Sequence, residues 1–308
     1  MESKSTNTTM AYLRSFTNFL SWARGFEVSP LPCSSLHYTL FLTSQLREAK
    51  SFSAFAVSYY SVIWAHGIAG LPSPSNDMSK NVLAAAKRRL SNRSKNKKLP
   101  LPYDAVKKLY DQTDFTSLYH MRTLCFILLG FFGFLRFSEI AALTIADITF
   151  HQNHLTLNIR ASKTDQYRRG HSVVLARNRH EPPQPCPWHV VSTYIHLLHP
   201  PRGRGGRSLF PLLRHRSDTF LPLPNTKLSY TRCRELFLEA LHRIGLANIS
   251  NFSLHSLRSG GATHASHSGV DSGMVKKHGR WATDSSKDGY VADSVARQLA
   301  VTRLMLKK

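Results

Sequence analysis

The sequence has few cysteines, few acidic residues and no long hydrophobic run. Its four cysteines, Cys33, Cys125, Cys186 and Cys233, stand far apart, which excludes a zinc-binding pattern and a small disulfide framework. They are expected to be reduced, mostly buried thiols of an intracellular protein. The longest apolar run, 124–135, is shorter than the roughly 20 residues that a membrane-spanning helix needs. The polar start, with no apolar stretch after it, does not indicate secretion.

Acidic residues are scarce beside basic ones. The 308 residues contain 18 Asp and Glu against 41 Lys and Arg, a formal net charge of +23. The excess is spread along the chain, because residues 1–98 carry 13 basic and 4 acidic side chains and the remainder carries 28 and 14. Nucleic acid is therefore the first candidate partner and an anionic membrane surface the second, while an acidic small substrate is disfavoured.

Length and composition predict two domains that are mainly α-helical. A hydrophobic content of 42% is enough for real cores, and apolar residues recur at three-to-four spacing in four segments of residues 1–90. We place a basic linker at 91–101 and a second domain at 102–308. In that domain, the alternation in 155–159 and the short apolar stretch 171–175 predict a β-hairpin. The fold class is thus mainly α with a small antiparallel β-sheet (α+β).

Basic residues gather at the end of the first domain and in the linker. The candidates for contacts to a phosphate backbone are Lys87, Arg88, Arg89, Arg93, Lys95, Lys97 and Lys98. Three interpretations are open: a solvated linker, a basic strap across a phosphate backbone, and a nuclear import signal.

Several kinds of site are absent from the sequence. There is no Gly-x-x-x-x-Gly-Lys phosphate loop, no Gly-x-Ser-x-Gly elbow, and no His or carboxylate set with metal spacing. We therefore predict neither a metal nor a cofactor.

Two pairs of polar residues stand out instead. Arg136 follows the apolar run 131–135, and Glu139 comes three residues later, so that on a helix the two would share a face. They are either a structural ion pair or an arginine held rigidly for a phosphate. His255 and Arg258 have the same spacing in the expected first turn of a helix, where anions are favoured.

A tyrosine near the end of the chain completes the candidate set. Tyr290 lies nine residues after Trp281, in a segment that starts Gly279-Arg280-Trp281. A phenol has a pKa of about 10 and attacks phosphorus only where cations stabilise the phenolate. Lys163, in the expected hairpin turn, would by itself be an ordinary exposed lysine.

The order of these residues resembles the tyrosine recombinase family: phage integrases, Cre, the Xer proteins, and the recombinases of DIRS-like and Crypton-like eukaryotic mobile elements. The resemblance covers about residues 103–295, and the first 90 residues resemble the family's helical core-binding domain in length and charge. The residues that carry it are Arg136, Lys163, His255, Arg258, Trp281 and Tyr290.

The resemblance implies the chemistry of cleavage. Tyr290 would attack the scissile phosphodiester, which gives a 3′-phosphotyrosyl link and a free 5′-hydroxyl. Arg136 and Arg258 would hold the non-bridging oxygens, and Glu139 would brace the first arginine.

The remaining residues would move or hold protons. Lys163 would protonate the leaving 5′-oxygen, and His255 would assist proton transfer at the tyrosine. Trp281 would supply packing and an indole N–H. No metal or ATP is implied, since the tyrosyl link conserves the energy of the phosphodiester.

The resemblance also implies a two-domain clamp on double-stranded DNA. Four copies on two sites would exchange strands through a Holliday junction, and the tail from residue 291 would pack either on its own domain or on a neighbour. The Gly-Arg-Trp sequence suggests a eukaryotic mobile-element enzyme. The protein would then be nuclear, and otherwise cytoplasmic or nucleoid-associated, with no membrane partner.

Two alternatives share the DNA partner. A type IB topoisomerase-like enzyme would use the same tyrosine chemistry but would relax supercoils. A domesticated DNA-binding protein would no longer cut, although all six positions here hold chemically competent residues.

Overall fold

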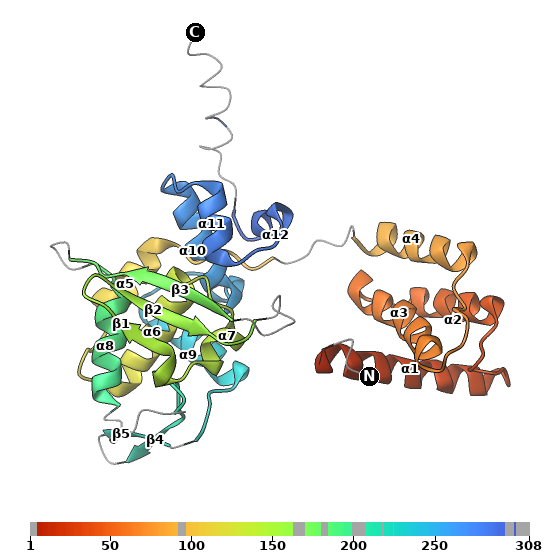
Figure 1. The fold of residues 1–308 in the computed structure, drawn as a ribbon, viewed down its shortest axis with the longest axis horizontal. Helices are drawn as coiled ribbons and strands as arrows, with labels where there is room; N and C mark the ends of the chain where they lie inside the picture. Colours follow the sequence, from red (N-terminus) through yellow and green to blue (C-terminus); the bar gives the residue numbers. More distant parts are fainter. Residues whose placement is uncertain are drawn as a thin grey trace, which may run out of the picture. The chain divides into compact units, whose positions relative to one another are not determined.

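A computed structural model describes residues 5–91, 97–162, 170–179, 184–198, 207–216, 219–223, 225–292 and 299. The chain divides into two compact units, residues 1–96 and 97–308 (Figure 1). The described fold is mainly helical with small antiparallel sheets, which confirms the predicted fold class. Among the described residues, no helix is long and apolar enough to span a bilayer.

The N-terminal unit contains the four helices that apolar spacing predicts. They are α1 (Thr6–Gly25), α2 (Ser35–Glu48), α3 (Phe52–Ile68) and α4 (Asp77–Ser91). The first three begin after a serine whose hydroxyl accepts a backbone N–H of the first turn, namely Ser5, Ser34 and Ser51. Their apolar faces meet in an aromatic core, in which the rings of Phe19 and Phe41 lie 4.9 Å apart in a T-shaped arrangement.

The C-terminal unit packs its helices around one large apolar core. Its first elements are α5 (Tyr103–Asp111), α6 (Leu118–Phe132), α7 (Phe137–Ala142), a 3₁₀ turn (Ile145–Asp147), β1 (Ile148–Phe150), β2 (His154–Ile159), β3 (His171–Ala176) and α8 (Pro187–Leu197). The remainder are β4 (Leu213–Arg216), β5 (Thr219–Pro222), α9 (Tyr230–Arg243), a 3₁₀ turn (Ile249–Asn251), α10 (His255–His267), α11 (Ser272–Gly279) and α12 (Asp284–Asp288). All four cysteines are free and buried, as predicted.

The predicted hairpin forms, with one more strand than expected. Strands β2 and β3 pair antiparallel, and Leu157 stands opposite Val173 on the face buried in the core. Strand β1 adds to the other edge of β2, and β4 and β5 form a separate hairpin. Neither was predicted.

Helix α10 lies very close to helix α6. A Cβ atom on Gly261 would stand 1.9 Å from the carbonyl oxygen of Phe131, and one on Gly260 would stand 2.3 Å from that of Leu101. Only glycine permits this approach. Because α10 begins at His255 and contains Arg258, Gly261 sets how far these residues stand from the end of α6, and Gly260 sets how far they stand from the segment before α5.

Candidate active site

The first predicted arginine lies at the start of α7. Arg136 has extended backbone and precedes the helix, so the expectation that it shares a helical face with Glu139 is wrong in detail. The pairing itself forms because Glu139 reaches back. Its Oε1 accepts from Arg136 Nη1 at 2.8 Å, and its Oε2 accepts from the Arg136 backbone N–H at 2.9 Å. The Glu139 side chain is buried, whereas 12% of the Arg136 side chain is exposed.

The second predicted arginine is fully buried on α10. Arg258 donates from Nη1 to the carbonyl of Phe134 and from Nη2 to that of Gly279, the latter at 2.6 Å. Its Nη1 is 3.9 Å from Glu139 Oε2. Burial, and then the nearby charge of Arg136, lower the pKa of Arg258. An anion bound beside the guanidinium would oppose this shift, because an opposite charge favours the charged form.

The turn after α11 brings an indole onto Arg258. Gly279 makes room for it, because a Cβ there would stand 1.8 Å from Cζ3 of Trp281. The buried Trp281 ring lies 4.6 Å from Arg258 Cζ, close enough for a cation–π contact. Its Nε1 is buried without a hydrogen-bond partner among the described residues. The indole N–H is therefore a donor that no acceptor of the described residues satisfies.

The predicted nucleophile faces the same guanidinium. The ring of Tyr290 lies 5.0 Å from Arg258 Cζ, and its centroid is 5.3 Å from that of Trp281 and 6.0 Å from that of His255. Thr263 on α10 holds the backbone directly after Tyr290, on both sides of Val291. Its hydroxyl donates to the Tyr290 carbonyl at 3.4 Å and accepts from the N–H of Ala292 at 2.9 Å.

The structure thus places six predicted site residues together: Arg136, Glu139, His255, Arg258, Trp281 and Tyr290. His255 is exposed at the start of α10. Lys163, Arg93 and Lys95 lie outside the described residues.

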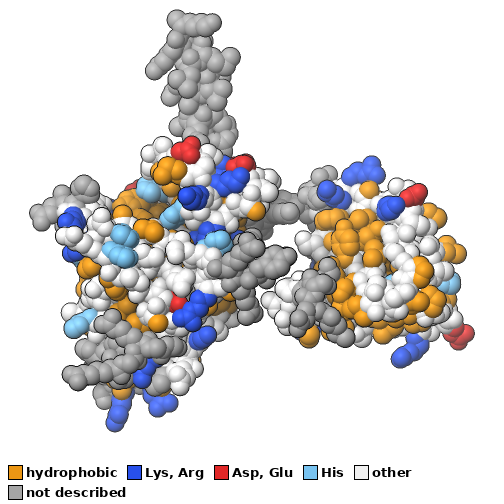
Figure 2. Space-filling model, viewed as in Figure 1, with side chains coloured by type: hydrophobic (Ala, Val, Ile, Leu, Met, Phe, Trp, Pro, Cys, Tyr) orange, Lys and Arg blue, Asp and Glu red, His pale blue; other side chains and the backbone are white. Residues whose placement is uncertain are grey.

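The other predicted DNA contacts lie on the surface. Lys87, Arg88 and Arg89 are exposed on α4, and Lys97 and Lys98 are exposed at the start of the C-terminal unit. Lys and Arg side chains are visible on both units in Figure 2. Lys98 donates from Nζ to the carbonyl of Ser250 at 2.6 Å, which leaves a fixed positive charge beside the 3₁₀ turn that precedes α10.

The arrangement is suited to an anion that a phenol can attack. It places guanidinium groups, an imidazole and an unpartnered indole N–H around one tyrosine ring. Within the described ranges, no group of three or more His, Cys, Asp or Glu side chains could hold a metal ion.

Known proteins share this fold. No family profile matches the chain. Over 313 aligned residues it is 26% identical to an integrase/recombinase XerD homolog of Selenomonas ruminantium, a match that spans 99% of this chain and 87% of that protein. The chain is thus similar in sequence to an integrase/recombinase, and the solved structures below show that its fold is that of recombinases.

Solved structures of recombinases have a similar fold at low identity. The integrase of the Tn1549 transposon, in complex with transposon right-end DNA, has a TM-score of 0.63 at 12% identity, over 99% of this chain and 95% of that one. The XerH site-specific recombinase, bound to a palindromic difH substrate, has a TM-score of 0.60 at 14% identity. The match covers 96% of this chain and 78% of that one.

One residue of this site was not singled out from the sequence. Arg280 donates from Nη2 to Glu139 Oε2 at 2.8 Å, so that three guanidinium groups surround one carboxylate. The only signal for it was a charged residue directly before Trp281, and nothing in the local pattern showed that it is buried.

Proposed function

We propose that this protein is a tyrosine recombinase, a site-specific DNA recombinase or integrase that cleaves and rejoins DNA through a 3′-phosphotyrosine intermediate. The observation that carries the proposal is the position of the Tyr290 ring against the Arg258 guanidinium, within the cluster that holds Arg136. Cations there lower the free-energy cost of the phenolate that attacks phosphorus. The similarity to an integrase/recombinase supports the same activity.

The number of ester bonds at the scissile phosphorus is the same before and after cleavage. The Tyr290 oxygen forms a bond to the scissile phosphorus and loses its proton, while the bond from phosphorus to the 5′-oxygen breaks. The 5′-oxygen takes a proton, which we assign to Lys163. Attack by a 5′-hydroxyl on the phosphotyrosine reverses these changes, so that one bond is exchanged for another and neither ATP nor a metal is needed.

The arginines stabilise the charge that grows on the non-bridging oxygens. The Arg136 side chain stays partly exposed while Glu139 fixes its Nη1, which is a suitable geometry for gripping a phosphate. Arg258 adds positive charge from below the Tyr290 ring. We assign His255 to proton transfer at the tyrosine, and the unpartnered indole N–H of Trp281 to a phosphate oxygen.

The two units would clamp double-stranded DNA. We assign residues 1–90 to a core-binding domain, 91–101 to a basic linker and 102–308 to the catalytic domain with its tail. The exposed Lys87, Arg88 and Arg89 on α4 would contact phosphates, together with Lys97 and Lys98. The excess of basic residues in both halves supports contacts along the whole chain.

A recombinase of this kind would act as a homotetramer on two DNA sites and pass through a Holliday junction. We propose that the tail after Tyr290 docks on a neighbouring copy. Val291, at its start, packs on the chain's own apolar cluster around Trp281. We further propose a mobile-element origin, with nuclear localisation in a eukaryotic host.

A strand-exchange assay tests this function against its alternatives. Two duplexes of different length would carry candidate sites from the ends of the DNA element that encodes the protein. Recombinant duplexes, absent with Tyr290→Phe, are expected. Relaxation of supercoiled plasmid without recombinants would favour the topoisomerase-like alternative. Tight binding with neither product would favour a DNA-binding protein that no longer cuts.

A further inference from the structure

Arg280 has an unusual backbone conformation and a buried guanidinium. Arg280 follows α11 with a backbone φ of 57°. This lies in the left-handed region, which residues other than Gly, Asn and Asp rarely adopt. Only 6% of its side chain is exposed. Burial lowers the pKa of Arg280, while Glu139 opposes that shift. A strained, desolvated arginine of this kind persists only where its contacts hold it.

Those contacts connect the two turns that carry the arginines of the site. Nη1 donates to the carbonyls of Gly133 at 3.3 Å and His278 at 3.2 Å, and Nη2 donates to that of Phe134 at 3.3 Å. The turn 133–135 leads into Arg136. Phe134 also accepts from Arg258. Arg280 therefore fixes the segment that carries the first arginine and an acceptor of the second.

Glu139 is the second connection. Its Oε1 accepts from Arg136 Nη1, and its Oε2 accepts from both the Arg136 backbone and Arg280 Nη2. Arg280 therefore restrains rotation of the carboxylate whose other oxygen holds Arg136. Three guanidinium groups against one carboxylate leave an excess of two positive charges, which favours an anionic group at the exposed side of Arg136.

We propose that Arg280 is a positioning residue that acts through Glu139 and the 133–135 turn, and orients Arg136 toward the scissile phosphate. The proposal rests on the proposed function. Arg280 does not grip the phosphate itself, since each of its two terminal nitrogens already donates both of its hydrogens to protein oxygens, whereas each terminal nitrogen of Arg258 donates only one to the described residues.

Two substitutions at Arg280 separate its charge from its backbone conformation. Arg280→Asn keeps a residue that tolerates the left-handed region, but it removes the charge and cannot reach Glu139. Arg280→Lys keeps a cation that can pair with Glu139, but it loses the planar guanidinium whose two terminal nitrogens donate to several acceptors at once.

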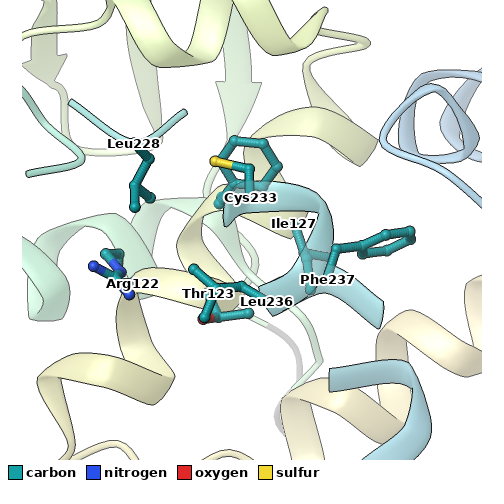
Figure 3. Close-up of a pocket in the computed structure, with 8 residues that line it drawn as sticks. Arg122, Thr123, Ile127, Leu228, Cys233, Leu236 and Phe237 are labelled. Carbon is teal, nitrogen blue, oxygen red and sulfur yellow. The ribbon is translucent and has the colours of Figure 1, made fainter. Parts of the chain in front are cut away.

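The matched control is another buried arginine of the same unit. Arg122 on α6 is 3% exposed and donates from Nη1 to the carbonyl of Pro211 at 3.2 Å. It lines a pocket with Leu228 and Cys233 that shares no residue with the site (Figure 3). Arg122→Gln therefore removes a buried guanidinium without touching Glu139.

The experiment measures DNA affinity and the rate of covalent adduct formation at saturating DNA, with the full-length protein on a nicked suicide substrate. Arg280→Asn is expected to keep the affinity within about threefold and to slow the rate roughly 10- to 100-fold, the range usual for groups that orient a ligand-binding side chain. Arg280→Lys should recover part of the rate. Arg122→Gln should form the adduct at the wild-type rate even if its melting temperature falls.

Three results would overturn the proposal: a wild-type rate with Arg280→Asn, no recovery with Arg280→Lys, or an equal loss with Arg122→Gln. The failure of the proposed function itself would look different, because the wild-type protein would then form no adduct.

Discussion

The contact between α10 and α6 predicts a large effect from the smallest possible substitution. In Gly261→Ala, the new Cβ would meet the Phe131 carbonyl oxygen at 1.9 Å, a distance that real Cβ atoms do not reach. The two helices must separate by about 1 Å, and overpacking of this kind costs about 1–3 kcal/mol. The bond from Arg258 to the Gly279 carbonyl, 2.6 Å long, would stretch or break. Loss of such a charged bond costs about 1.5–3 kcal/mol.

Alanine regains about 1 kcal/mol as the better helix former, so the net loss for Gly261→Ala is about 1.5–5 kcal/mol. Urea unfolding of the full chain measures it, and adduct formation on a suicide substrate should fall with it. Gly67→Ala in α3 is the matched control, since no atom lies within 4 Å of its Cβ and the change should be neutral or stabilising. Equal stability of the two variants would refute the reasoning.

Three further outcomes are expected. Glu139→Gln removes the buried carboxylate that three arginines surround and should cost about 3–5 kcal/mol in urea unfolding; a loss below about 1 kcal/mol would contradict the ion cluster. Burial lowers the pKa of His278, so the unfolded chain binds a proton first as the pH falls below about 6.5. The stability that neutral His278 contributes is therefore lost as the pH falls. The melting temperature of His278→Gln should depend less on pH than that of the wild type. Thr263→Val removes the hydroxyl that holds the backbone at Tyr290 and Ala292, and should slow adduct formation about 10-fold at unchanged DNA affinity; an unchanged rate would show that this hydroxyl does not position the tyrosine.

Elements with a clear local pattern could be predicted from the sequence. The alternation of Leu155, Leu157 and Ile159 gave the buried face of β2, and helical spacing gave the four N-terminal helices. Strand β1 spans three residues, too few to show alternation, and it depends on pairing with β2. Strands β4 and β5 are only four residues each.

The site could be predicted as an ordered set of residue types but not as a geometry. Spacing related Arg136 to Glu139, yet it suggested a shared helix where the structure has a residue before the helix. The burial of Arg258 depends on carbonyls more than 20 residues away in either direction. Arg280 pairs with a carboxylate 141 residues earlier, and no local pattern carries such a contact.

The most direct test of the proposed chemistry is to find which atom of the protein becomes linked to DNA. A nicked suicide substrate traps the adduct, and protease digestion followed by mass spectrometry locates the linked peptide. The expected result is a 3′-phosphate on the Tyr290 oxygen, with no adduct from Tyr290→Phe. A link to another residue, or an adduct that persists in Tyr290→Phe, would contradict the assignment of Tyr290 as the nucleophile.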